Sequence, residues 1–354
     1  MNNPFDIKFA NGLTGDPAVL MQSRRSGEHV LFDLGDISNL SHKEVLKVRK
    51  IFLSHTHMDH FYGFDKLLRF NIPHRKQVEV FGPKGLGKNV QGKLKGYTWN
   101  LIDDDQIPFK ICELDGKPNQ KHYFCGKKSN FELEELGAKE GSLLAVLEDK
   151  SQVFGIALDH NGIDSISYQV KAPPFTRVDS DALVKLGLRS GSWIAELLDR
   201  AKDMTPGDKI TIEDQEYSVE SLKDQLLIDG SHYVFSYVTD IGFTKSNIKL
   251  IQNNFLKSDS LVIECSFKDA ELARSVQKAH LTSKQSALIA AVLKCRSFQP
   301  FHVSNIYDGR EEEVIDEARS FFNVFNEMDS EKLKIELLKE HERISQCRSD
   351  LGVP

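Results

Sequence analysis

Cysteines, long apolar runs and a leader-like beginning are scarce or lacking in this sequence. Five cysteines among 354 residues form neither a CxxC motif nor an even framework, so we expect reduced thiols in a cytosolic protein. Apolar runs such as residues 286–293 are far shorter than the roughly 20 residues needed to cross a bilayer. The first residues carry neither the basic nor the apolar region of a secretory signal. We therefore expect a cytoplasmic protein with no membrane association.

The composition is that of a globular chain whose charge is unevenly distributed. Glycine (23) and proline (11) occur at ordinary frequencies, which excludes collagen-like and low-complexity classes. The net charge is −6, but residues 311–342 hold eleven acidic and four basic residues, leaving 41 acidic and 42 basic residues elsewhere. A polyanionic substrate is therefore neither required nor excluded. We expect residues 311–354 to form an acidic helical segment packed on the main domain.

Strand-like and helix-like segments alternate in both halves of the chain. Residues 50–54 and 261–264 have the pattern of buried strands, whereas Thr282-Ser-Lys-Gln285 is a capping box that predicts a helix to about residue 296. A solvated loop is the interpretation of the lysine-rich stretch that contains Lys84, Lys88, Lys93 and Lys95. The alternation, with no linker between autonomous domains, predicts an α/β layered sandwich.

The segment Ser54-His-Thr-His-Met-Asp-His60 carries the clearest chemical signal. It places three histidines and one aspartate within six residues, directly after an apolar strand. A tight loop at a strand end can turn these side chains toward one point, where His-x-His supplies two imidazoles to one metal ion. Imidazole and carboxylate ligands without thiolates suit Zn²⁺ or Mn²⁺ in a hydrolytic site. The segment therefore predicts a metal centre in preference to a solvated histidine-rich loop.

This pattern resembles the metallo-β-lactamase superfamily, which requires three further ligands at strand ends. His160, Asp240 and His302 each end or nearly end an apolar strand, in the order His, Asp, His that the resemblance requires. The resemblance implies a four-layer αββα sandwich of the metallo-β-lactamase type over residues 1–310. It also implies a set of seven metal ligands, namely His55, His57, Asp59, His60, His160, Asp240 and His302.

Within that superfamily the sequence is similar to ribonuclease Z, the endonuclease that matures tRNA 3′ ends, from about residue 5 to residue 322. The similarity is carried by Phe32-Asp-Leu-Gly-Asp36, Asp59-His-x-x-Gly63, Phe81-Gly-Pro-x-Gly85, Tyr168, Ile263-Glu-Cys-Ser266, His280-Leu-Thr282 and His302-Val-Ser304. Ile263 replaces the first histidine of a His-Glu-Ala-Thr motif, and Ile306 stands where an arginine is expected. The metal and proton-transfer positions are kept, whereas several changes fall where the family contacts RNA.

The resemblance implies a dinuclear centre with Zn²⁺, or alternatively Mn²⁺, in which Asp240 bridges the two ions. One ion is assigned to His55, His57 and His160, and the other to Asp59, His60 and His302. A metal-bridging hydroxide would attack the phosphorus, with Asp59 orienting or deprotonating the water. His280, oriented by Glu264, is the candidate acid that protonates the leaving alkoxide. The predicted catalytic residues are therefore Asp59, His280 and Glu264.

Residues at about 170–202 resemble the stretch that leads into the tRNA-binding arm of ribonuclease Z. Basic residues alternate there with apolar helix positions, which suits a protruding arm and equally suits an ordinary amphipathic helix pair. Each phosphate that such residues neutralise would strengthen RNA binding. The candidate RNA contacts are Lys171, Arg177, Lys185 and Arg189. The resemblance also implies a homodimer.

Four functions compete for this sequence. The leading prediction is a dinuclear-metal phosphodiesterase that removes the 3′ trailer of pre-tRNA endonucleolytically. The alternative is a phosphodiesterase of the same core acting on a small substrate such as a cyclic nucleotide, because several RNA-contact positions are altered. The His280–Glu264 pair suits a phosphoester leaving group and so disfavours an acyl hydrolase. A non-catalytic binding module is disfavoured because no ligand position is lost.

Overall fold

The computed structural model describes residues 3–115, 119–255 and 257–352. The chain divides into two compact units. The larger contains Asn3–Lys171 and the chain from Val234 onward, and the smaller contains Ala172–Tyr233. Among the described helices, none is long and apolar enough to cross a membrane. All five cysteines are free, and four of them are buried.

An eight-stranded mixed sheet forms the first half of the larger unit, with its strands in chain order. Pairing is parallel from β3 to β6 and antiparallel at both ends. Each parallel pair requires a crossover connection, and helices supply it. The strands are β1 (Phe5–Phe9), β2 (Val19–Ser23), β3 (His29–Phe32), β4 (Val48–Phe52), β5 (Val78–Pro83), β6 (Phe109–Asp115), β7 (Asn119–Cys125) and β8 (Glu134–Glu140).

A six-stranded sheet forms the second layer, in the order β18-β17-β16-β11-β10-β9. β16, β17 and β18 are parallel neighbours, whereas β9, β10 and β11 pair antiparallel. The three parallel strands therefore end at the same edge of the sheet. The strands are β9 (Leu143–Val146), β10 (Gln152–His160), β11 (Ile163–Ala172), β16 (Tyr233–Val238), β17 (Ser260–Glu264) and β18 (Ser297–Phe301).

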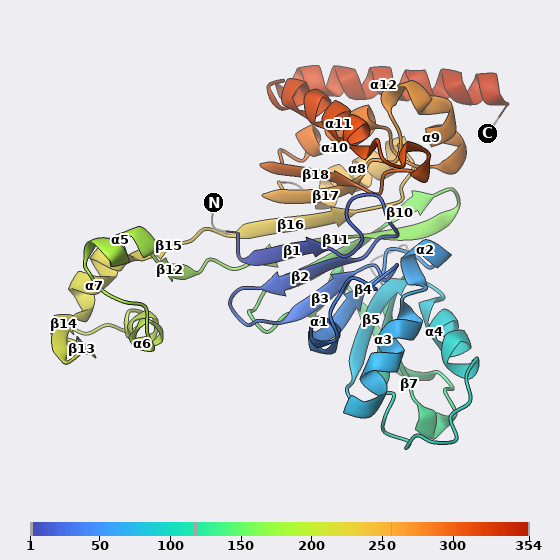
Figure 1. Ribbon diagram of the computed structural model, residues 1–354. Coiled ribbons are helices and arrows are strands. Elements are labelled where there is room, and N and C mark those ends of the chain that lie inside the picture. The colour runs from blue at the N-terminus through green and yellow to red at the C-terminus, as the bar shows by residue number, and fades with distance from the viewer. Residues whose placement is uncertain (1–2, 116–118, 256, 353–354) are drawn as a thin grey trace. The chain divides into compact units, whose positions relative to one another are not determined.

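Helices cover the outer face of each sheet in the larger unit (Figure 1). The first sheet carries α1 (His42–Lys47), α2 (Met58–Phe61), α3 (Phe64–Asn71) and α4 (Leu86–Lys95). The second sheet carries α8 (Lys245–Asn254), α9 (Leu272–Lys278), α10 (Ser283–Val292), α11 (Glu311–Asn326) and α12 (Ser330–Leu351). Short 3₁₀ helices lie at Ile72–His74, Lys127–Ser129, Asp269–Glu271 and Asn305–Tyr307. The larger unit is thus an αββα sandwich, which confirms the predicted α/β fold class.

Aromatic rings fill the space between the two sheets. The ring centroid of Phe32 on β3 lies 5.9 Å from that of Tyr168, 5.4 Å from that of Phe235 and 5.3 Å from that of Tyr237. All four rings are fully buried. The Tyr168 hydroxyl donates a hydrogen bond to the Leu53 carbonyl at 2.5 Å, so the second sheet fixes the end of β4. This contact positions the loop that follows β4.

The C-terminal segment forms the outermost helical layer of the larger unit. Phe325, Leu333, Leu337 and Ile344 pack into the apolar cluster that covers the second sheet. One of the acidic residues of α12 points inward. Glu340 is fully buried and forms an ion pair with Lys284 at 3.0 Å. This ion pair compensates for the hydration that the buried carboxylate has lost. Residues 311–352 therefore contribute to the core, despite their acidity.

The interpretation of the lysine-rich stretch as a loop is wrong for Lys88, Lys93 and Lys95, whereas Lys84 does lie in a turn. Residues Leu86–Lys95 form α4, which follows the turn at Gly85 (φ 93°). Leu86, Val90 and Leu94 recur at intervals of four residues and are completely buried against the first sheet. The four-residue spacing of these apolar positions is present in the sequence, but the lysines between them favour the interpretation as a solvated loop.

The smaller unit has its own apolar core, and it extends beyond the predicted insertion at about 170–202. Leu197, Ile210, Val219 and Leu226 belong to one buried cluster, so the segment up to Tyr233 folds together. Its elements are β12 (Thr176–Val178), α5 (Ser180–Lys185), α6 (Trp193–Arg200), β13 (Lys209–Ile212), β14 (Gln215–Ser218), α7 (Val219–Leu226) and β15 (Leu227–Asp229).

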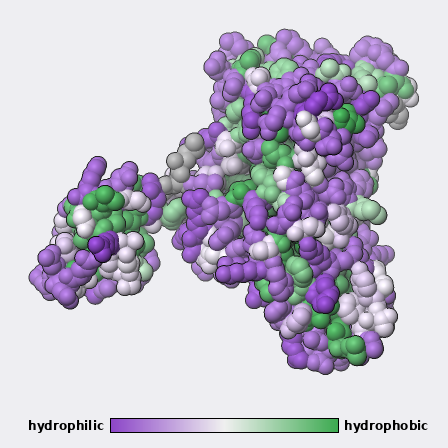
Figure 2. Space-filling model, in the orientation of Figure 1, coloured by the Kyte–Doolittle hydropathy of each residue, from purple (hydrophilic) through white to green (hydrophobic). Residues whose placement is uncertain are grey.

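Hydrophobic side chains gather on one face of the smaller unit, as Figure 2 shows, whereas the larger unit is mostly hydrophilic on the same view. Val184 and Leu186 are 76% and 41% exposed. Both flank Lys185, so this part of α5 offers apolar and basic groups together. The function of the unit as an arm stays a prediction.

A close backbone contact holds the segment after β4 against the segment after β3. The Leu34 amide donates to the His60 carbonyl, and the Gly63 amide donates to the Leu34 carbonyl, both at 2.9 Å. A Cβ atom at Gly63 would lie 2.0 Å from the Gly35 carbonyl oxygen, which leaves no room for any side chain.

We therefore expect Gly63→Ala to lower the free energy of unfolding by about 1–3 kcal/mol, because the two backbone segments must separate. The matched control is Gly92→Ala on α4, where no atom lies within 4 Å of the added Cβ and alanine favours the helix. Urea denaturation of both variants provides the measurement. Equal stability of the two variants would contradict the close packing of Gly63.

Candidate metal centre

Strand ends bring the candidate residues together at one edge of the larger unit. Asp240 follows the end of β16, Glu264 is the last residue of β17, and His302 follows β18 directly. These strands are parallel neighbours, so their carboxyl ends meet. His160 is the last residue of β10 in the same sheet. β18 ends at Phe301, and this leaves His302 free to turn out of the ladder.

The histidine-rich segment forms a short loop and the single turn of helix α2. His55 is buried, His57 is exposed at the N-cap of α2, and His60 is fully buried on that helix. Asp59 is partly exposed on the same turn. The short helix allows residues that are three to five positions apart to face one region, which an extended strand would not do.

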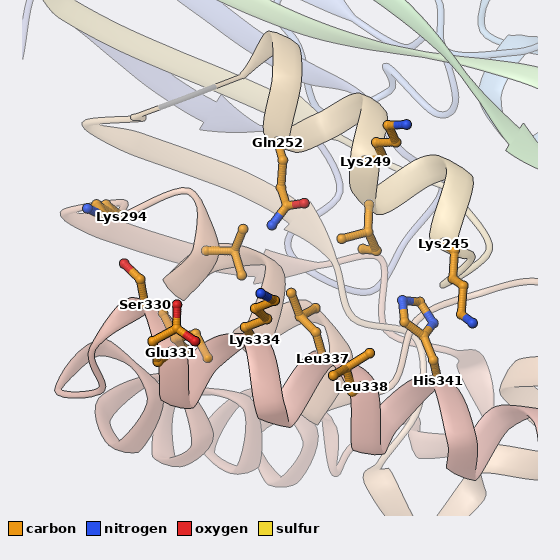
Figure 3. Close-up of a pocket in the computed structure, with 13 residues that line it drawn as sticks. Lys245, Lys249, Gln252, Lys294, Ser330, Glu331, Lys334, Leu337, Leu338 and His341 are labelled. Atoms are coloured by element: carbon orange, nitrogen blue, oxygen red, sulfur yellow. The ribbon is translucent and has the colours of Figure 1, made fainter.

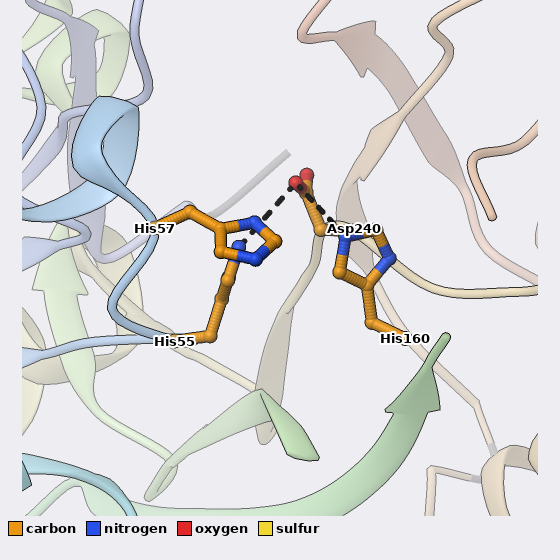
Figure 4. A group of neighbouring side chains, drawn as sticks. All are labelled: His55, His57, His160 and Asp240. Carbon is orange, nitrogen blue, oxygen red and sulfur yellow. Dashed lines mark ion pairs between the residues drawn. The ribbon is translucent and has the colours of Figure 1, made fainter. Parts of the chain in front are cut away.

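The first group of ligand atoms belongs to His55, His57, His160 and Asp240. One atom from each residue lies within 4.8 Å of the others. The Asp240 Oδ2 atom is 3.7 Å from His55 Nε2 and 3.9 Å from His160 Nε2. Figure 4 shows the rings of His55 and His57, from one loop, converging with the His160 ring and the Asp240 carboxylate from two other segments of the chain.

The second group of ligand atoms belongs to Asp59, His60 and His302, which also lie within 4.8 Å of one another. Asp240 is adjacent to this group too, because its Oδ2 atom is 3.2 Å from His60 Nε2 and its Oδ1 atom is 3.2 Å from His302 Nε2. The structure thus brings together all seven residues that the sequence predicted as ligands. Asp240 lies between the two groups, as a bridging carboxylate would.

The histidine rings are oriented by hydrogen bonds at their outer nitrogens. The Nδ1 atoms of His55, His60 and His160 lie 3.0 Å from Ser54 Oγ, Asp33 Oδ2 and the Ala279 carbonyl, respectively. Each Nε2 atom therefore faces Asp240. The Nε2 atoms of His55 and His60 are buried and have no hydrogen-bond partner among the described residues. Buried nitrogens without partners, together with carboxylates, fit a pair of cations.

Asp33 positions this centre, although it was assigned no role from its sequence context. It is fully buried at the end of β3, where it accepts hydrogen bonds from the Ser54 amide at 2.6 Å and the Tyr237 hydroxyl at 2.7 Å. The same carboxylate contacts His60 Nδ1. Two features of the sequence indicate a role for Asp33. It is an ionisable residue directly after the apolar run His29–Phe32, and it belongs to the motif Phe32-Asp-Leu-Gly-Asp36.

Burial and neighbouring carboxylates push the pKa values of the rings in opposite directions. Burial lowers the pKa of His55 to about 2, and its neighbour His60 adds to that effect. Burial alone would also lower the pKa of His60, but Asp240 and Asp33 outweigh it and raise that pKa well above its usual value. Burial opposes ionisation of Asp240, yet the surrounding histidines hold its pKa well below the ordinary range. The cluster is arranged around a negative charge on Asp240.

Four residues other than glycine have left-handed backbone conformations at this edge. Asp33, Asp240, Ala279 and His302 have φ values of 56°, 47°, 53° and 56°. Residues other than glycine rarely adopt this region, and each costs about 1–3 kcal/mol when strained. The sharp turns they make direct the side chains at the strand ends into the centre. These four left-handed residues beside one cluster support this edge as the candidate functional site.

A histidine–carboxylate pair lies beside the ligand groups. His280 Nδ1 is 2.8 Å from Glu264 Oε2 and 4.0 Å from Asp240 Oδ1. Glu264 is completely buried, and its other oxygen accepts a hydrogen bond from the Ile241 amide at 2.6 Å. Burial would lower the pKa of His280, but Glu264 and Asp240 raise it to about 9. Asp240, His280 and His302 also form a third cluster of potential ligand atoms.

A hollow of about 270 Å³ opens beside these residues. Asp59, His280 and His302 line it on the side of the centre. Lys278 also lines the hollow, as does Ile306, which stands where the resemblance predicted an arginine. The centre is therefore accessible to a substrate.

The four predicted RNA contacts do not line this hollow. Arg177, Lys185 and Arg189 are exposed in the smaller unit, and none of the described residues forms an ion pair with them. Lys171, at the end of the larger unit, lies over the Phe154 ring with its Nζ atom 4.5 Å from the ring centroid. Their contact with RNA stays a prediction.

Comparisons with known proteins place the fold and the centre in context. No family model matches the chain. Ribonuclease Z from Deinococcus radiodurans is 24% identical over 293 residues, which cover 82% of this chain and 86% of that protein. A ribonuclease Z from Bacillus cereus is 25% identical over 306 residues, covering 84% of this chain and 85% of that protein.

The fold is also similar to solved structures. The metallo-β-lactamase fold protein YhfI from Bacillus subtilis superposes with a TM-score of 0.52 at 13% identity, covering 91% of this chain and 94% of YhfI. Yeast PDE1 superposes with a TM-score of 0.53 at 10% identity and the same coverage. The chain therefore has the metallo-β-lactamase fold. Over most of its length it is a distant homologue of ribonuclease Z, and its cluster of histidines and aspartates is typical of a dinuclear metal site in that fold.

We expect Asp33→Asn to weaken metal binding by about 10–100-fold, because the amide no longer supports the His60 ring with a negative charge. A competing chelator titrated against the metal-loaded protein measures this change. NMR titration of the metal-free variant should also show a lowered pKa for His60. The control is Asp103→Asn, an exposed aspartate paired only with Arg75 among the described residues. Equal metal affinity in both variants would show that Asp33 is merely structural.

Proposed function

We propose that this protein is a dinuclear-metal phosphodiesterase that resembles ribonuclease Z and removes the 3′ trailer of pre-tRNA. The proposal includes a homodimeric enzyme with Zn²⁺ as the preferred ion and Mn²⁺ as the alternative. Two features support it together. Homologues named ribonuclease Z align over most of the chain, and the candidate residues Asp59, His280 and His302 line one accessible hollow.

The pair formed by His280 and Glu264 is the observation that carries the proposal. A phosphodiester with an alkoxide leaving group needs a proton donor, because an alkoxide is too basic to depart alone. His280 lines the hollow, and its Nδ1 atom is held by the buried Glu264 carboxylate. The remaining ring nitrogen, Nε2, is then the atom that can donate a proton to the leaving oxygen.

The other candidate residues would bind the metal ions and orient the water and the substrate. His55, His57 and His160 would hold one cation, Asp59, His60 and His302 the other, and Asp240 both. When bound, the two cations supply Lewis acidity that polarises the phosphate and acidifies water. Asp59 lines the hollow and is the group placed to orient the attacking water. Lys278 is placed to contact a phosphate oxygen of the substrate.

The smaller unit is the proposed tRNA-contacting arm. Its net charge is negative, because residues 172–233 contain seven basic and twelve acidic residues. Attraction of RNA would therefore depend on individual exposed cations. Lys202 and Lys209 are neutralised by Asp199 at 3.0 Å and Glu216 at 2.7 Å. Arg177, Lys185 and Arg189 are exposed cations without such partners among the described residues, so phosphate contacts would be concentrated on them.

Two observations favour a small phosphodiester, such as a cyclic nucleotide, as the alternative substrate. Ile306 lines the hollow at the position where the resemblance predicted an arginine, which removes a cation from the substrate's surroundings. The smaller unit has an excess of acidic residues, which weakens its long-range attraction for RNA. The metal centre and the His280–Glu264 pair would serve this alternative equally well.

We expect His280→Ala to keep its metal content but to lose about 10²–10⁴-fold in turnover of a substrate with an alkoxide leaving group. The loss with bis-p-nitrophenyl phosphate should be much smaller, because p-nitrophenolate departs without protonation. Elemental analysis and turnover of both substrates give the measurement, with exposed His74→Ala as the control. Loss of a metal equivalent would instead assign His280 as a ligand, consistent with its place in the third cluster of potential ligand atoms.

The substrate is tested with a labelled pre-tRNA, a cyclic nucleotide, bis-p-nitrophenyl phosphate and a lactone. If pre-tRNA is the substrate, Lys185→Gln/Arg189→Gln should weaken its binding and flatten the salt dependence by about one unit of slope per lost phosphate contact. Hydrolysis of the small diester should not change. The matched control is Lys202→Gln/Lys209→Gln, whose lysines are already paired. Cleavage of the cyclic nucleotide without cleavage of pre-tRNA would establish the alternative function.

A further inference from the structure

A second and larger hollow, of about 550 Å³, lies between α8 and α12 (Figure 3). Side chains from the two helices face each other across it, and the end of α10 and residue Lys294 close one end. None of the proposed metal ligands or catalytic residues lines this hollow. Its volume falls in the range of small-molecule binding sites.

The base of this hollow is apolar. Its apolar side chains are those of Ile248, Val292, Leu333, Leu337 and Leu338. Most of them are buried in the cluster beneath the helices, but Leu338 remains 52% exposed on α12. Covering this surface would remove apolar area from water, which favours binding.

The rim of the hollow carries an excess of positive charge. Four lysines contribute to it, namely Lys245, Lys249, Lys294 and Lys334, against one carboxylate, that of Glu331. No ion pair joins any of these lysines to another described residue. The contrast within α12 is clear, because Lys332 and Lys339 pair with Asp329 at 3.4 Å and Glu336 at 2.8 Å.

We propose that the hollow between α8 and α12 binds a small amphipathic anion, an alkyl or aryl carboxylate or phosphate, separately from the metal centre. The apolar body would cover Leu337 and Leu338, and the anionic head would contact Lys245 or Lys334. An inorganic anion would leave the apolar base exposed, and a neutral apolar molecule would leave the lysines unpaired. A nucleic acid fits less well, because no Phe, Tyr or Trp lines the hollow for base stacking among the described residues.

The test measures binding of octanoate and of octyl phosphate to the metal-loaded protein by isothermal titration calorimetry. Octanoate tests a carboxylate head group, and octyl phosphate tests a phosphate head group. We expect one equivalent of at least one of these anions to bind, with affinity that falls as salt is raised. Acetate, which has the charge without the chain, and 1-octanol, which has the chain without the charge, should bind on the order of tenfold more weakly or not at all.

Variants locate the site. Lys245→Gln/Lys334→Gln should weaken binding on the order of tenfold, because charged hydrogen-bond donors are lost. The matched control is Lys110→Gln/Lys121→Gln, two exposed lysines on β6 and β7 that likewise form no ion pair with any described residue. Leu338→Asn tests the apolar contact at an exposed position, where folding should not suffer.

Three results would overturn the proposal. The first is the absence of saturable binding by both octanoate and octyl phosphate. The second is equal weakening by the two lysine pairs, which would indicate only a general effect of charge. The third is binding of a short RNA that depends on Lys245 and Lys334 while the two amphipathic anions fail to compete, which would make the hollow a nucleic-acid contact instead.

Discussion

The Asp240 carboxylate is 2% exposed and lies within 4.0 Å of ring nitrogens of five histidines. The histidines are His55, His60, His160, His280 and His302. A buried carboxylate has lost most of its hydration, and five closely spaced rings cannot all carry a proton, because like charges repel. Two cations bound among these groups would resolve both problems. They would replace the lost hydration of the carboxylate and bind the rings of His55, His60, His160 and His302 as neutral ligands, while His280 stays paired with Glu264.

This constraint accounts for features that would be costly elsewhere. The left-handed backbone at Asp33, Asp240 and His302 directs three side chains from separate strands into a space a few ångströms wide. Tyr237 and Ser54 donate hydrogen bonds to Asp33, so the carboxylate behind His60 is itself fixed. A metal centre requires this second layer, because ligands that are free to rotate lose affinity and geometry. Left-handed backbone and buried charge therefore coincide at this centre.

The α/β fold class and the metal-binding loop after Lys50–Ser54 were predictable from short sequence patterns, whereas the αββα layering and the full set of seven candidate ligands were implied by the family resemblance. The ligands stand at the ends of apolar strands such as Lys50–Ser54, and strand ends meet at one edge of a sheet. Asp33 was not assigned, because its role depends on packing against Tyr237, about 200 positions later in the chain. A loop was predicted in place of α4, because the exposed lysines made the segment look solvated despite three apolar positions that are buried in the structure. The far boundary of the smaller unit, at Tyr233, depends on a shared core that no local pattern reveals.

The outer helices also hold in place the chain segments that carry residues of the metal centre. The Asn247 side chain on α8 donates to the Asp159 and Gly242 carbonyls at 2.8 Å, which ties together the residues next to His160 and Asp240. On the other side, the Glu340 carboxylate of α12 accepts a hydrogen bond from Gln285 at 2.9 Å, and Gln285 caps the helix that follows His280. The acidic C-terminal segment thus helps to hold the loop of the proposed acid. Because α8 and α12 also form the walls of the second hollow, the elements that position the chemistry and the elements that would contact an amphipathic anion are the same two helices.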